Sequence, residues 1–113
     1  MELSVFERLL LRNIVPQIQG WNYAHMKEAR ELIEGLFTEE EEADLQFEQV
    51  ETQVKWKIKR EDDSDIPQER DIPVSDGLKS KIGKFLTQLD KEEKLNFEHL
   101  SLYEKMVGEE KSA

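Results

Sequence analysis

The strongest constraint on the fold is a change of hydrophobic period near the middle of the chain. Apolar and basic residues alternate there one by one: Val54, Lys55, Trp56, Lys57, Ile58 and Lys59. A period of two is typical of a strand with one buried and one solvated face. A partner strand over residues 46–50, turning through Glu51 and Thr52, would complete a β-hairpin. Because helical patterns lie on both sides, the sequence predicts an α+β fold dominated by helices.

Three helices are predicted before the hairpin, over residues 5–13, 23–35 and 38–45. Two of them begin with the spacing of a capping box, Ser4 with Glu7 and Thr38 with Glu41, in which side chain and backbone at the helix start bond reciprocally. Apolar residues recur at helical spacing in the first two. The stripes are Phe6, Leu9, Leu10 and, at the next helical position, Asn13; then Met26, Ala29, Leu32, Ile33 and Leu36.

Two further helices are predicted after the hairpin. The first starts at Ser75 or Asp76 and continues through Leu89, and the second is capped by Asn96 and ends at Gly108. The stripe of the last helix is Leu100, Tyr103 and Val107, and residues from 109 onward are predicted to fray.

The segment between the hairpin and these helices, residues 61–74, is polar and lacks an apolar period, so we expect a loop. Within it Asp65-Ile66-Pro67 recurs as Asp71-Ile72-Pro73, and a short third strand is expected over residues 72–74.

A chain of 113 residues is expected to form one domain. Its parts are N-terminal helices over about residues 5–45, the hairpin over 46–59, an acidic loop over 61–74 and C-terminal helices over 76–107. Three helices followed by a hairpin also match the order of elements in a winged helix.

Charge is the second main feature of the sequence. Residues 28–51 hold ten carboxylates against a single arginine, and the whole chain carries a formal charge of −10. This charge opposes approach to nucleic-acid phosphates and to anionic lipid surfaces. The chain contains no cysteine, which excludes disulfides and thiolate sites, and no apolar run long enough to span a bilayer. We therefore expect a cytoplasmic protein that does not bind membranes or nucleic acid directly.

The negative charge also disfavours a winged-helix protein that binds DNA. Its recognition helix would be residues 38–45, where five of the six residues from Glu39 to Asp44 are acidic. Phosphates would repel such a helix, and the cations Lys55, Lys57, Lys59 and Arg60 on the hairpin are too few to compensate.

No catalytic residue, cofactor or metal site is predicted. Asp62, Asp63 and Asp65 lack the glycine and glutamate that a calcium loop requires. His25 and His99 stand outside any metal-binding or nucleophile motif.

These observations predict a non-enzymatic protein that binds a basic protein partner; inhibition or modulation of a surface that otherwise binds nucleic acid is one form that this binding could take. The residues predicted to bind this partner are Trp21, Glu31, Glu34, Glu39, Glu40, Glu41, Glu42, Asp44 and Glu48. The carboxylates are expected to point outward together, with Trp21 as an exposed anchor. The plain alternative is that the acidic run is a solvated face and a capped first helical turn.

Two other classes of function remain open at this point. A self-associating accessory module would pair through the stripe of the last helix or the edge of the hairpin. A small-ligand-binding protein or hydrolase would need a concave pocket with convergent polar groups.

Three segments resemble small uncharacterised proteins encoded by phages and prophages. They are residues 3–11 (LSVFERLLL), 54–56 (VKW) and 102–105 (LYEK). The resemblance implies a small accessory protein that acts by association in a bacterial cytoplasm, on a host enzyme or on another copy of itself. It carries over no catalytic residues.

Overall fold

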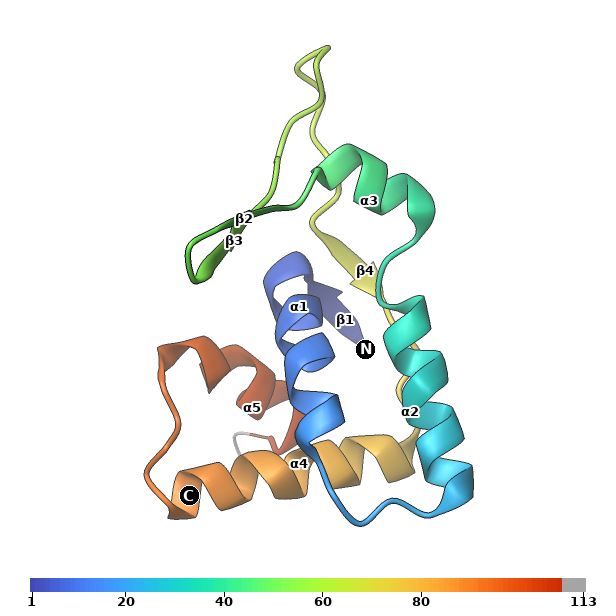
Figure 1. Ribbon diagram of the computed structural model, residues 1–113, viewed down its shortest axis with the longest axis vertical. Helices are drawn as coiled ribbons and strands as arrows, with labels where there is room; N and C mark the ends of the chain where they lie inside the picture. The colour runs from blue at the N-terminus through green and yellow to red at the C-terminus, as the bar shows by residue number, and fades with distance from the viewer. Residues whose placement is uncertain (109–113) are drawn as a thin grey trace.

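The computed structural model describes residues 1–108, which form five α-helices and two small antiparallel sheets (Figure 1). The elements follow in the order β1 (Glu2–Ser4), α1 (Val5–Ile14), η1 (Val15–Gln17), α2 (Tyr23–Gly35), α3 (Glu39–Leu45), β2 (Glu48–Val50), β3 (Gln53–Lys55), β4 (Glu69–Asp71), α4 (Asp76–Lys91), η2 (Phe97–His99) and α5 (Leu100–Met106), where η denotes a 3₁₀ helix. This confirms the predicted α+β class. The prediction of a frayed end at residues 109–113 lies outside the described residues.

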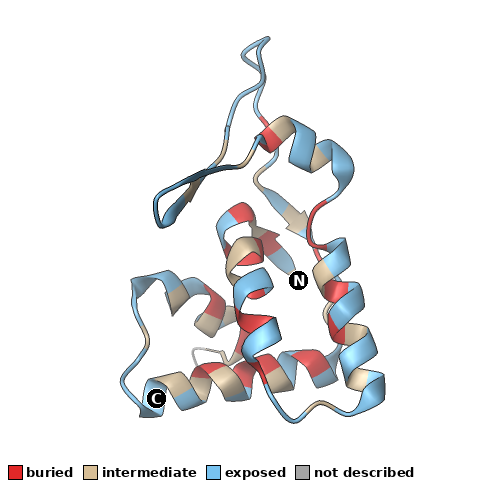
Figure 2. Cartoon of the chain, viewed as in Figure 1, coloured by how far each residue is buried: buried red, intermediate tan, exposed pale blue. Residues whose placement is uncertain are grey.

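The core lies where α1, α2, α4 and α5 face one another (Figure 2). Leu11, Leu36, Ile82, Leu86 and Leu102 are completely shielded from solvent. The hairpin and the segment after it stand away from this core and are largely exposed. No helix within residues 1–108 combines the length and the apolar content that crossing a bilayer requires.

Helix starts follow the predicted caps. Both capping boxes are formed, with Ser4 Oγ accepting from Glu7 N at 3.1 Å and Thr38 Oγ1 accepting from Glu41 N at 3.1 Å. Asn22 caps α2 in the same way. These local bonds satisfy backbone donors that have no partner inside the helix, so the helix starts could be predicted from sequence spacing alone.

The buried face of α1 differs from the prediction. The predicted stripe is not the main core face: Phe6 is 40% exposed, Leu9 and Leu10 are half-buried, and Asn13 is exposed. The residues that α1 buries are Val5, Glu7, Arg8, Leu11 and Ile14. The helix is therefore apolar on two faces. The inner face was not recognised from the sequence because it also carries two charged residues, Glu7 and Arg8.

The hairpin has the predicted pairing, with Gln49 opposite Val54 and the turn at Glu51 and Thr52. The second strand of the hairpin is shorter than predicted, however. After Trp56 the chain leaves the hairpin and folds back on itself in a separate arm. In this arm Ile66 N donates to Ile58 O at 2.9 Å, and the arm projects from the top of the molecule in Figure 1. Ile58 is therefore 61% exposed, and its predicted burial was wrong.

The N-terminal strand was not predicted. β1 pairs antiparallel with β4, with Leu3 opposite Arg70. The strand predicted over residues 72–74 therefore corresponds to β4, which lies just before that range. The two isoleucines of the repeated Asp-Ile-Pro tripeptide, Ile66 and Ile72, are both buried, which explains the repeat as two anchors for one extended segment. The hairpin strands pair only with each other, and a winged-helix arrangement is not confirmed.

The predicted stripe of the last helix was also out of phase. The residues that α5 buries are Leu102 and Met106, whereas Leu100 is 54% exposed. Leu100, Tyr103 and Val107 do share one side of α5, but Leu102 and Met106, on the neighbouring side, face the core most closely. Tyr103 and Val107 are only partly buried against the core, and the spacing of apolar residues alone does not show which of two apolar sides faces inward.

This phase gives a stability prediction for neighbouring leucines. Leu102→Ala should lower the free energy of unfolding by roughly 2–5 kcal/mol, because it leaves a cavity in the core. Leu100→Ala, two residues away, should change it by less than about 1 kcal/mol. Urea unfolding followed by circular dichroism measures both, and equal losses would contradict the phase of α5.

Candidate functional site

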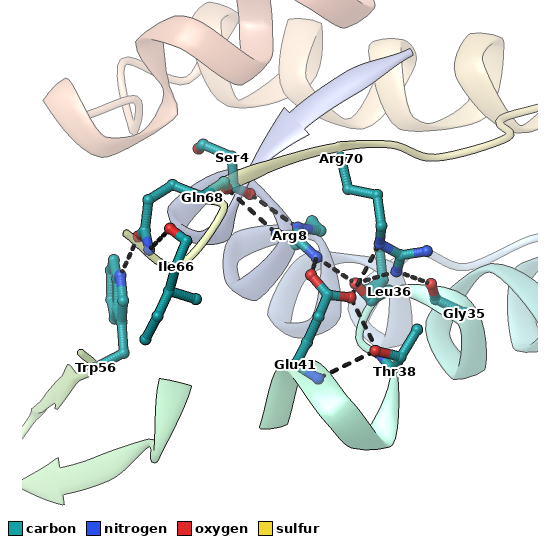
Figure 3. Close-up of polar contacts among 10 residues, drawn as sticks. All are labelled: Ser4, Arg8, Gly35, Leu36, Thr38, Glu41, Trp56, Ile66, Gln68 and Arg70. Carbon is teal, nitrogen blue, oxygen red and sulfur yellow. Dashed lines mark hydrogen bonds and ion pairs between the residues drawn. The ribbon is translucent and has the colours of Figure 1, made fainter. Parts of the chain in front are cut away.

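The acidic helix α3 is fixed by one carboxylate that turns inward, Glu41 (Figure 3). Its Oε2 accepts from Arg8 Nη1 at 2.6 Å, and its Oε1 accepts from Thr38 N at 3.1 Å. Oε1 also lies 2.9 Å from Arg70 Nε. The Glu41 side chain is 19% exposed. Three separate segments, α1, the start of α3 and β4, therefore meet at this single carboxylate.

Arg8 is the cation at the centre of this contact, and its side chain has no solvent exposure. Besides Glu41, it donates to the backbone oxygens of Leu36 at 2.9 Å and Gln68 at 3.2 Å. Its guanidinium carbon lies 4.7 Å from the centre of the Phe37 ring. A buried cation needs such partners because removing a charge from water is costly.

Arg70 closes the same junction from β4. Its Nη2 donates to the backbone oxygens of Gly35 at 2.6 Å and Leu36 at 2.9 Å. These carbonyls lie at the end of α2, where helical partners run out and cations are favoured. Arg8 and Arg70 thus join the end of α2 to the start of α3.

The environment of Glu41 lowers its pKa below the usual 4.5. Burial opposes ionisation, but the hydrogen bond from Arg8, the backbone bond from Thr38 and the charges of Arg8 and Arg70 outweigh it. Glu7 behaves in the same way: burial is outweighed by the hydrogen bond from Lys105, whose Nζ lies 2.7 Å from Glu7 Oε1, and by the Ser4 backbone.

Two of the predicted partner-binding carboxylates are therefore neutralised within the protein. Glu41 faces the buried Arg8, and Asp44 forms an ion pair with Arg60 at 3.1 Å. Glu48 remains exposed but lies opposite Lys55 in the hairpin register. The expectation that all the carboxylates point outward together was therefore wrong for Glu41 and Asp44, which are paired with cations of the same chain.

The remaining carboxylates form what we call the acidic surface. Its residues share exposure to solvent and absence from any ion pair within residues 1–108; they are Glu31, Glu34, Glu39, Glu40 and Glu42. They belong to the second half of α2 and the outer side of α3, next to each other along the chain and in space (Figure 1).

Trp21 is not an exposed anchor. It is half-buried against the core, and Lys81 Nζ lies 5.2 Å from the centre of its ring. The lysine covers the aromatic face in a cation–π contact, so the Trp21 side chain has a structural role.

Neither Arg8 nor Arg70 was predicted from the sequence to belong to the site. One signal was present for Arg8, since it shares a helical face with Val5 and with Leu11, both completely or nearly completely buried. A cation on such a face requires a buried acid. Nothing local marked Arg70, because β4 reaches the site only through its pairing with β1.

His99 Nδ1 accepts from Asn96 N at 3.1 Å and so completes a helix cap. No group of three or more His, Cys, Asp or Glu within residues 1–108 is arranged to hold a metal ion.

The inward contact of Glu41 predicts unequal effects for adjacent glutamates. Glu41→Gln should lower the free energy of unfolding by roughly 2–4 kcal/mol, because it leaves Arg8 buried without a counter-charge. Glu40→Gln, its exposed neighbour, should cost less than about 0.5 kcal/mol. Urea unfolding at neutral pH compares the two variants, and a small loss for Glu41→Gln would show that Arg8 does not depend on that carboxylate.

The lowered pKa of Glu41 predicts a pH dependence for the same pair of proteins. A carboxyl group whose pKa is lower in the folded state stabilises the protein above its unfolded pKa, and the effect disappears as pH falls through the folded pKa. The difference in unfolding free energy between wild type and Glu41→Gln should therefore shrink as pH is lowered below about 4.5. A difference that stays constant down to pH 3 would contradict this assignment.

Comparisons with known proteins add no relative from which a role could be transferred. No family model, curated protein or solved structure matches this chain. The resemblance to phage-encoded proteins stays a prediction, and the function has to be argued from the surfaces themselves.

Proposed function

We propose that this chain is a non-enzymatic interaction protein whose acidic surface binds a basic surface on another protein. The observation that carries the proposal is the inward lock of Glu41 by Arg8 and Arg70. It fixes the rotation of α3, so that Glu39, Glu40 and Glu42 occupy the outer side of the helix.

Fixed carboxylates suit recognition of arginine and lysine. Charge-assisted hydrogen bonds are about twice as strong as neutral ones, and little backbone entropy is lost when the acidic groups stand on a helix that is already ordered. Complementary charge also speeds encounter, so association should be fast and sensitive to salt. The net charge of −10 attracts the whole protein to positively charged surfaces.

The partner class that fits best is a protein surface built to bind nucleic-acid phosphates. Such a surface presents several cations in a row, and closely spaced carboxylates along one helix offer several anions in return. Occupying that surface would inhibit or modulate nucleic-acid binding by the partner.

The test compares neutralising variants in a pull-down from cell lysate. Glu39→Gln, Glu40→Gln and Glu42→Gln in one chain remove three charges from the acidic surface but leave Glu41 in place. Captured proteins should be lost relative to wild type, and for a captured partner the association rate constant should fall roughly tenfold at low salt while the dissociation rate changes less.

The control removes the same charge elsewhere. Glu69, Glu93 and Glu104 are exposed and lie outside the acidic surface, so their triple Gln variant should bind like wild type. An excess of double-stranded oligonucleotide should displace the protein from its partner if both use one surface. The proposal is overturned if both triple variants retain the same proteins, or if binding is insensitive to salt.

A further inference from the structure

The second apolar face of α1 lines a groove on the opposite side of the molecule from the acidic surface. Phe6, Leu9 and Leu10 form its floor, and Val54 and Trp56 of the hairpin segment form one wall of a hollow of about 610 Å³. The wall is held in place because Trp56 Nε1 donates to Gln68 Oε1 at 2.9 Å (Figure 3). An apolar stripe on a helix normally packs against another element, and here it is left open.

Two large apolar side chains near this groove are largely exposed: Phe97 is 95% exposed and Leu100 is 54% exposed. They line a second hollow, together with Leu95 and Tyr103. They lie in η2 and at the start of α5, and Glu98, which follows Phe97, lines the groove. The segment from η2 to the start of α5 therefore carries exposed apolar side chains and also borders the groove. Figure 1 shows the start of α5, α1 and the hairpin on the same side of the molecule.

The polar residues at the groove complement each other in charge. Arg12 lines it, and its guanidinium carbon lies 5.5 Å from the centre of the Phe37 ring and 5.9 Å from that of Phe47. Glu98 lines it from η2. Neither forms an ion pair with another residue in the described part of the chain.

We propose that this face binds a second copy of the chain in a symmetric dimer. Phe97 and Leu100 of each copy insert into the groove of the other, and Arg12 of each copy faces Glu98 of the other. In a two-fold dimer the same patch serves both partners, so projection and hollow must lie on one face, as they do here.

Size and charge are compatible with this arrangement. A standard interface covers about 800 Å² of each partner, about a tenth of the 7945 Å² surface of this chain. None of the carboxylates of the acidic surface lines the groove, which lies on the α5 side of α1, whereas α2 lies on the other side of α1 (Figure 1). Dimerisation also leaves that surface free, and the two proposals do not depend on each other.

The first test measures mass against concentration by sedimentation equilibrium. Wild type should change from the 13.4 kDa monomer to twice that mass as concentration rises. Phe97→Ser should raise the dissociation constant at least about tenfold, as expected for an aromatic residue at the centre of an interface. The matched control is Tyr23→Ser, which removes an aromatic side chain that is 82% exposed at the far end of the molecule, and it should dimerise like wild type.

The second test exchanges the charges. Arg12→Glu and Glu98→Arg should each be monomeric, because each homodimer would contain two like-charged contacts. An equal mixture of the two variants should dimerise again, since one chain then carries two acidic and the other two basic groups at these positions. Only a contact between copies is restored by mixing.

A wild type that keeps its monomer mass up to millimolar concentration overturns the proposal. So does a Phe97→Ser variant that dimerises like wild type, which would place any dimer contact elsewhere. If the charge variants stay monomeric when mixed although circular dichroism shows them folded, the Arg12 to Glu98 contact is refuted. Pull-down of a basic partner by Phe97→Ser should match wild type, which separates failure of this proposal from failure of the proposed function.

Discussion

The buried guanidinium of Arg8 is the interaction on which the arrangement of this protein depends. It has no contact with solvent, and besides the Ser4 oxygen at the start of its own helix, the groups that compensate its charge come from distant parts of the chain: the end of α2, the first turn of α3 and the segment that leads into β4. A buried ion pair of this kind adds little net stability compared with apolar packing, but leaving it half made is costly. The contact therefore favours this fold over others, since any other arrangement of the chain that separates these segments would leave the Arg8 cation without partners.

This contact divides the acidic run into carboxylates with different roles. Glu41 neutralises the core cation, and Asp44 connects α3 to the projecting arm through Arg60. Their neighbours Glu39, Glu40 and Glu42 face solvent because Glu41 does not. The inward residue and the outward ones are thus two consequences of one helical rotation, and the acidic surface is presented by a helix that cannot turn without breaking the core contact.

Features that depend on neighbouring residues could be predicted from the sequence, and features that depend on distant ones could not. The Ser4 and Thr38 caps bond within three residues, so spacing located the starts of α1 and α3. Alternation located the hairpin. The prediction failed at Ile58, because the chain pairs with Ile66 there, and at Leu100, because the core takes the neighbouring apolar side of α5. The roles of Arg8 and Arg70 require the pairing of β1 with β4, which nothing near either strand indicates.

The pairing of β1 with β4 also bears on the order in which the chain can fold during synthesis. Arg70, the partner of Leu3, follows it in the chain by 67 residues (70 − 3). At about 5–20 residues per second, α1 waits for several seconds at least before its cation can be enclosed. Until then Arg8 lacks the Gln68 oxygen and Glu41 lacks Arg70, so the buried cation is fully enclosed only after β4 has been synthesised.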